Sequence, residues 1–300
     1  MKIIKNRQNK PLCVLGYGPK GLGKTSLAAQ FPNPILIDIE KGAAYVDIDQ
    51  WPCDTYLDVV EALKKLVDSE YQTIAIDSLD WLEALAKDFI KEKYKTDSFE
   101  KAAGGYGKSY IELLDLNRAV KDILEKARQR GKHIYLIAHP RKVSENNPMV
   151  ETTFDRFEVK LQDSKNVSVK DFWTEYVDFL FFLNKDIYTV GKGKEARAED
   201  SGTYLFTKNC AAYDAKSRVK MPEKIKFEEK GMFEVISSFF KNNTLPKDDA
   251  NADDLFAYVL SLAEACQDQE VRKYTLSVLP KYKTDATKLK EIQAYIEGKK

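Results

Sequence analysis

The chain has 300 residues, of which 43% are apolar and 32% charged, and 48 basic against 47 acidic side chains give a formal net charge of +1. This composition is typical of one large or two ordinary globular domains, and the near-zero charge excludes a uniformly basic nucleic-acid coat protein. Apolar runs fall short of the roughly 18 residues that span a bilayer, so we expect a cytoplasmic protein with no membrane partner. The widely spaced cysteines and two histidines argue against a structural zinc site.

The first 184 residues alternate short apolar runs with amphipathic stretches. We expect strands at Leu12–Leu15, Ile35–Ile39, Thr73–Ile76, Ile134–Ala138 and Val177–Leu183. We expect helices at Leu57–Val67, Leu79–Tyr94 and Ile111–Arg130, the last preceded by a capping box of Ser109 and Glu112. Because strands that are apolar on both faces are buried on both faces, the pattern predicts an α/β fold with a mostly parallel central sheet flanked by helices.

Two polar stretches interrupt this alternation. Arg141–Lys170 is too long for a plain connection and predicts a functional or disordered loop, and Gly191–Gly202 predicts a flexible hairpin tip. After about residue 244 the patterns are helical, with no further strand. We therefore expect a core over residues 1–244 and a small helical C-terminal appendage over residues 245–300.

A phosphate-binding motif follows the first strand. Residues Gly18–Thr25 match G-x-x-x-x-G-K-[ST], with an apolar strand before them and a helix-forming segment after them. Glycines let backbone N–H groups converge on phosphate oxygens, Lys24 is expected to bridge the outer phosphates of ATP, and Thr25 offers a hydroxyl to Mg²⁺. A chance glycine-rich turn is the alternative. The predicted nucleotide-binding residues are Gly18, Pro19, Lys20, Gly21, Leu22, Gly23, Lys24, Thr25 and Ser26.

Two acids at strand ends complete the predicted site. Asp77 follows the third strand and is the expected second Mg²⁺ ligand, with a helix N-cap as its alternative role. Hydrolysis also needs a carboxylate that polarises the attacking water, and Ser78 stands where many ATPases carry a glutamate. We assign this role to Glu40 at the end of the second strand. Asp38 competes with Glu40, since strand alternation places both on one face.

Three further polar residues are candidates for contacts with the triphosphate. His139 ends the fourth strand, where it can sense the terminal phosphate, and a core histidine is the alternative. Lys216 and Arg218 point the same way in an extended segment, about 7 Å apart, so both can approach one triphosphate. A solvated basic strand end is the alternative for this pair.

The motifs, in this order, resemble the RecA-type ATPase core, and more closely the phage-encoded RecA-like ATPases of the Sak recombination group, known simply as phage nucleotide-binding proteins. The likeness spans about residues 11–240 and rests on the phosphate loop, Leu-Ile-Asp-Ile-Glu40, Ile-Asp77-Ser78, Tyr106-Gly-Lys108, Ile-Ala-His139 and Ala215-Lys-Ser-Arg218. It implies a RecA-like P-loop NTPase core in which Glu40 polarises water and His139 replaces the glutamine of RecA. It also implies that Lys216 and Arg218 reach the nucleotide of an adjacent subunit in a homo-oligomeric ring or filament.

The resemblance implies ATP hydrolysis that depends on single-stranded DNA, in phage recombination or annealing within the host cytoplasm. The stretch Arg141–Lys170 falls where RecA-like proteins place DNA-facing loops, and Arg118–Lys142 carries eight basic and two acidic residues. Four aromatic residues are candidates for stacking on bases, with a role in the core as the alternative: Phe154, Phe157, Phe172 and Trp173.

Other functions use the same motifs. The principal alternative is a ring-forming or helicase-loader ATPase in phage replication, although Ser78 after Asp77 departs from the AAA+ pattern. A small-molecule kinase, whose usual arginine-rich lid is not evident, and a nucleotide-binding module without turnover rank lower. The acidic first half of the appendage is a candidate for contact with a single-strand-binding protein or for mimicry of DNA, and a solvated helical cap is the favoured alternative.

Overall fold

The computed structural model describes residues 10–146, 152–164, 166–190, 197–241 and 268–297, together with residues 256, 259, 260, 262, 263 and 266. Contacts between residues divide the chain into two compact units, residues 1–230 and 231–300. The expected boundary between residues 244 and 245 lies outside the described residues, so the division into core and appendage stays a prediction.

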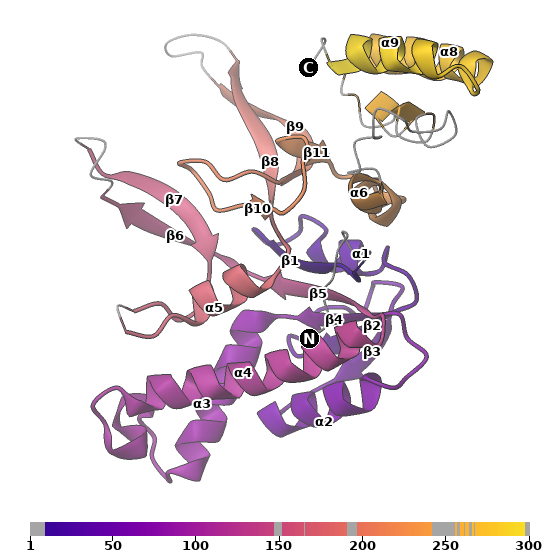
Figure 1. The fold of residues 1–300 in the computed structure, drawn as a ribbon. Helices are drawn as coiled ribbons and strands as arrows, with labels where there is room; N and C mark the ends of the chain where they lie inside the picture. Colours follow the sequence, from indigo (N-terminus) through magenta and orange to yellow (C-terminus); the bar gives the residue numbers. More distant parts are fainter. Residues whose placement is uncertain are drawn as a thin grey trace, which may run out of the picture. The chain divides into compact units, whose positions relative to one another are not determined.

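The described part of the first unit is built on a nine-stranded sheet (Figure 1). Across the sheet the strands are β11 (Lys224–Lys226), β9 (Arg197–Phe206), β8 (Phe179–Val190), β1 (Cys13–Tyr17), β5 (His133–Ala138), β4 (Thr73–Asp77), β2 (Pro34–Asp38) and β3 (Asp49–Pro52), and β10 (Lys216–Ser217) pairs with β8. Neighbouring strands from β8 to β3 are parallel, whereas β9, β10 and β11 pair antiparallel. The predicted α/β architecture with a mostly parallel sheet is confirmed.

Helices cover both faces of the sheet because its central strands are apolar on both sides. Along β1, Cys13, Leu15 and Tyr17 belong to the core shared with α2 (Tyr56–Leu66), α3 (Leu79–Lys93) and α4 (Lys108–Gln129). The other face meets α1 (Lys24–Ala28) and the residues after it, where the Phe31 ring packs against Tyr135 of β5. Figure 1 shows α2, α3 and α4 together on one side of the parallel strands.

The structure differs from the sequence-based expectations at two places, a helix start and an edge strand. The capping box at Ser109 and Glu112 is wrong, because α4 begins at Lys108 after Gly107, which takes the left-handed conformation with φ 78°. Ser109 is instead buried inside the helix. Strand β3 was not expected, since an edge strand of four mostly exposed residues lacks the apolar pattern of a buried strand.

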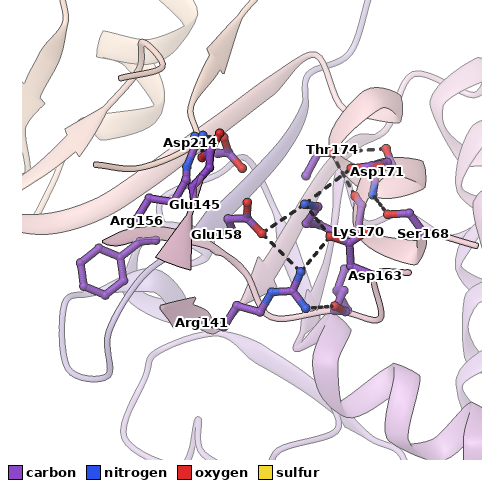
Figure 2. Close-up of polar contacts among 12 residues, drawn as sticks. Arg141, Glu145, Arg156, Glu158, Asp163, Ser168, Lys170, Asp171, Thr174 and Asp214 are labelled. Atoms are coloured by element: carbon purple, nitrogen blue, oxygen red, sulfur yellow. Dashed lines mark hydrogen bonds and ion pairs between the residues drawn. The ribbon is translucent and has the colours of Figure 1, made fainter. Parts of the chain in front are cut away.

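The polar stretch 141–170 is more ordered than a loop. Strands β6 (Pro140–Glu145) and β7 (Phe154–Val159) pair antiparallel, and α5 (Val169–Tyr176) follows. Figure 2 shows how charged side chains fix this hairpin. Arg141 contacts Glu158 at 3.3 Å and Asp163 at 3.0 Å, Lys170 contacts the same two carboxylates, and Arg156 bridges Glu145 and Asp214. Residues 147–151, between these strands, and residues 191–196 of the expected hairpin tip lie outside the described residues.

The described residues of the second unit are largely helical. They form α6 (Met232–Lys241), α8 (Gln269–Val278), a 3₁₀ turn (Leu279–Tyr282) and α9 (Ala286–Glu297). A small core collects Val259, Ala263, Cys266, Val271, Leu279, Leu289 and Ile296. In the part of the chain that the structure describes, every helix is too short or too polar to cross a membrane.

Candidate nucleotide-binding site

The phosphate loop lies between the carboxyl end of β1 and the first residue of α1, at Lys24. Two of its glycines are required by contact and conformation. A Cβ at Gly18 would lie 2.1 Å from the carbonyl oxygen of Leu183, and Gly23 has a φ of 84° and packs under the ring of Phe227. Because side chains are excluded at these two points, the backbone can turn tightly enough for its N–H groups to converge.

Lys24 is held inside the loop. Its Nζ donates to the carbonyl oxygens of Gly18 and Pro19, each at 2.8 Å, and only 7% of the residue is exposed. Burial lowers the pKa of Lys24, while the carboxylates of Asp77 and Glu40 act against this shift. A buried ammonium held by neutral carbonyls is well prepared to bind an anion, because a phosphate oxygen is a stronger acceptor than either carbonyl.

Thr25 and Asp77 meet as the predicted Mg²⁺ ligands would. Thr25 Oγ1 donates to Asp77 Oδ2 at 2.7 Å, and burial raises the pKa of Asp77 against the effect of this hydrogen bond. Asp77 is the last residue of β4, and Ser78, not Asp77, is the N-cap of α3. A hydroxyl and a carboxylate beside a phosphate loop are hard oxygen donors, so this pair fits Mg²⁺.

The two acids at the end of β2 have different surroundings in the structure. Asp38 is buried, and its Oδ1 accepts a hydrogen bond at 2.8 Å from the backbone N–H of Lys41, so its carboxylate stabilises the turn. Glu40 lines a pocket of about 580 Å³ next to the phosphate loop, and its Oε2 lies 3.6 Å from Nε2 of His139. Of the two candidates, Glu40 alone faces open space beside the loop.

His139 lies on the same pocket and has a partner that the sequence reasoning missed. Its Nδ1 lies 3.0 Å from Oδ2 of Asp80, and its backbone N–H donates to Oδ1 of the same carboxylate at 3.1 Å. The signal that could have found Asp80 is its place three residues after Asp77, in the first turn of the following helix. The pocket is lined by Pro19, Lys20, Glu40, Asp80, Trp81, Ala84, His139, Pro140 and Lys160.

Lys216 and Arg218 are not brought to this pocket within the chain. Lys216 Nζ donates to the carbonyl oxygens of Thr174 and Glu175 at the end of α5, and Arg218 contacts Glu175 and Asp178. Lys216 pairs with Leu180 near the start of β8, level with the middle of β1, while the phosphate loop follows the last residue of β1. Burial and the charge of Arg218 lower the pKa of Lys216.

Many residues of the expected DNA surface make contacts with other residues of the chain. Trp173 is fully buried and donates its indole N–H to Asn117 at 2.8 Å, so of its two candidate roles the one in the core is correct. Phe157 stacks on Phe182 of the core. Six cations of the basic stretch form ion pairs with nearby acids: Arg118 with Asp115, Lys121 with Asp122, Arg128 with Asp178, Arg130 with Asp68, Arg141 with Glu158, and Lys142 with Asp155.

A glycine-rich loop between a buried parallel strand and a helix, with an aspartate on a nearby strand touching its threonine, is the site of a P-loop NTPase. The family model for the AAA domain matches residues 10–219, more than two thirds of the chain. The protein belongs to this family of ATPase domains.

One curated relative is similar to part of the chain. The SPbeta prophage-derived uncharacterized protein YorG of Bacillus subtilis (strain 168) is 25% identical over 112 residues, which are 35% of this chain and 34% of the relative. The chain thus spans about a third of the length of the curated relative it matches. Together the family and the geometry of the site support a P-loop ATPase.

Proposed function

We propose that the protein is a Mg²⁺-dependent ATPase whose turnover depends on single-stranded DNA and which acts in phage DNA recombination or annealing. The observation that carries the ATPase assignment is the meeting of Lys24, Thr25, Asp77 and Glu40 at the carboxyl ends of parallel strands of one sheet. The order of motifs that resembles the Sak group, together with the prophage relative, supports the role in recombination.

Each residue has a distinct task in this proposal. Lys24 exchanges its two carbonyl acceptors for oxygens of the outer phosphates, and Thr25 and Asp77 hold Mg²⁺, which neutralises phosphate charge when bound. Glu40 accepts a hydrogen bond from the attacking water and orients it. His139, beside Glu40, lies within reach of the terminal phosphate.

Our proposal for partners follows the same resemblance. Single-stranded DNA would contact the hairpin of β6 and β7, where Phe154 is only half-buried, and not the buried Trp173. A homo-oligomeric ring or filament, a single-strand-binding protein at residues 245–300, and a location in the host cytoplasm belong to this proposal.

The test is ATP turnover measured with single-stranded DNA, with double-stranded DNA and without DNA. We expect stimulation by single strands and none by duplex, and background turnover in Lys24→Ala. A match to the AAA domain favours a second candidate, a ring-forming or helicase-loader ATPase. Turnover that ignores single-stranded DNA, combined with ATP-dependent rings in sedimentation, would replace the recombination role with that candidate.

A further inference from the structure

Asp80 makes unusually complete contact with His139. The carboxylate is nearly buried, with 9% of the side chain exposed, and it accepts from both the backbone N–H and the ring of His139. Ser78 Oγ donates to the same carboxylate at 2.8 Å, and Lys160 approaches it at 4.0 Å. A carboxylate with this many donors has a fixed orientation. It therefore also fixes the orientation of the His139 imidazole ring, which is hydrogen-bonded to it.

The contact decides which ring nitrogen carries a proton. An ionised carboxylate only accepts hydrogen bonds, so Nδ1 of His139 must carry a proton. Burial alone would raise the pKa of Asp80, but the hydrogen bonds from His139 and Ser78 leave it below its ordinary value, which keeps the carboxylate ionised. The ring then presents Nε2 to the pocket, 3.6 Å from Glu40 Oε2.

We propose that Asp80 is a positioning residue for His139: its carboxylate accepts a hydrogen bond from a protonated Nδ1 and thereby directs Nε2 toward Glu40 and the terminal phosphate. The catalytic consequence rests on the proposed ATPase function, while the tautomer itself does not. The competing explanation is that Asp80 only stabilises the first turn of α3, where acidic residues favour the helix dipole. A helix-stabilising role would leave the tautomer of His139 unaffected by Asp80.

The two histidines of the chain make a direct measurement possible. Nδ1 of His133 accepts a hydrogen bond at 2.9 Å from the backbone N–H of Leu12, so a neutral His133 carries its proton on Nε2. Long-range ¹⁵N–¹H correlation spectra of ¹⁵N-histidine-labelled protein, without nucleotide, should therefore show a proton on Nε2 for His133 and a proton on Nδ1 for His139. His133→Gln assigns the two rings. A wild-type His139 that carries its proton on Nε2 alone would overturn the proposal before any variant of Asp80 is made.

Asp80→Asn tests the cause. The amide keeps the shape of the carboxylate but can turn an N–H toward Nδ1, so we expect His139 to lose its Nδ1–H signature while His133 keeps its own. Glu83→Gln is the matched control, since Glu83 is another buried carboxylate of α3 and contacts Gln162 and Lys87, not His139. An unchanged His139 signature in folded Asp80→Asn protein contradicts the proposal.

Kinetics separates positioning from folding. Asp80→Asn should bind a fluorescent ATP analogue with wild-type affinity and lose about 10–100-fold in kcat, the usual range for outer-shell orienting groups. Asp80→Glu, which restores the carboxylate, should recover part of kcat. If wild-type protein hydrolyses no ATP, the spectra still test the tautomer, so the two proposals fail separately. A loss of affinity equal to the loss of kcat/KM would assign Asp80 to nucleotide binding instead.

Discussion

At the scale of single residues, the site depends on one buried cation. Lys24 is the charged group that the loop encloses, and its two carbonyl partners cannot replace its charge. We expect Lys24→Ala to lose nucleotide binding by at least about tenfold, because a charge-assisted hydrogen bond to phosphate is worth about 1.5–3 kcal/mol. The measurement is titration with a fluorescent ATP analogue, and Lys64→Ala, at an exposed lysine of α2, is the control. Unchanged affinity in folded Lys24→Ala protein would remove the nucleotide-binding assignment.

The acids Glu40 and Asp38 should separate binding from hydrolysis. Glu40→Gln keeps the shape of the side chain and removes the charge that polarises water, so we expect wild-type nucleotide affinity and a loss of about 10²–10⁴ in kcat. Asp38→Asn should mainly lower stability, since its carboxylate supports the turn at Lys41. Single-turnover hydrolysis and urea unfolding distinguish these effects. The opposite pattern would transfer the catalytic role to Asp38.

Two glycines of the phosphate loop form a matched pair for stability. Gly21 and Gly23 have similar positive φ angles, 76° and 84°, but a Cβ at Gly21 meets nothing within 4 Å, whereas at Gly23 it lies 2.7 Å from the Phe227 ring. Gly21→Ala should cost about 1–2 kcal/mol from the left-handed backbone alone. Gly23→Ala should cost more, and urea unfolding measures the difference. Equal losses of unfolding free energy would mean that the Phe227 ring moves away from the new Cβ at no cost in stability.

At the scale of elements, α4 and α5 are joined by a buried polar contact. Asn117 of α4 accepts the indole N–H of Trp173 of α5 and donates to the backbone oxygen of Leu113. We expect Asn117→Ala to lower the free energy of unfolding by about 1–3 kcal/mol, because the indole N–H is left buried without an acceptor. The double variant Asn117→Ala/Trp173→Phe should lose less than the sum of the single variants, as measured by urea unfolding. Additive losses would show that the two side chains do not interact.

At the scale of the whole molecule, the question is whether subunits share a site. Lys216 and Arg218 lie at the end of α5 in their own chain, away from the pocket beside the phosphate loop. If they serve an adjacent subunit, isolated monomers bind ATP and hydrolyse it poorly, and specific activity rises with protein concentration. A finger of this kind contributes about 10³–10⁵ in rate in other P-loop NTPases.

The decisive experiment mixes two nearly inactive proteins, Lys216→Ala/Arg218→Ala and Glu40→Gln. A shared site predicts recovered turnover, because some interfaces in the mixture combine an intact Glu40 with an intact pair of cations. Lys208→Ala, a nearby exposed lysine, is the control and should leave activity unchanged. No recovery, together with activity that is independent of concentration, would make the pair a structural cap of α5.

Local patterns along the chain were enough to predict the parallel sheet and the phosphate loop. Strands β1, β2, β4 and β5 and the first half of β8 are largely apolar runs, and the glycines, lysine and threonine of the loop are close together in the sequence. Asp77 was foreseeable on similar grounds, since the carboxyl ends of parallel strands meet at one edge of the sheet.

Contacts between distant residues settled what local patterns left open. Glu40 was separated from Asp38 by a turn hydrogen bond to Lys41, and Asp80 gained its role from His139, 59 residues away. The hairpin of β6 and β7 is held by long-range ion pairs of the kind drawn in Figure 2, which no local pattern encodes. From the sequence alone, Trp173 could lie at the surface or in the core. In the structure it lies in the core, where Asn117 accepts the hydrogen bond of its indole N–H. A polar or aromatic side chain has the same local signature in either place, and its partners decide its role.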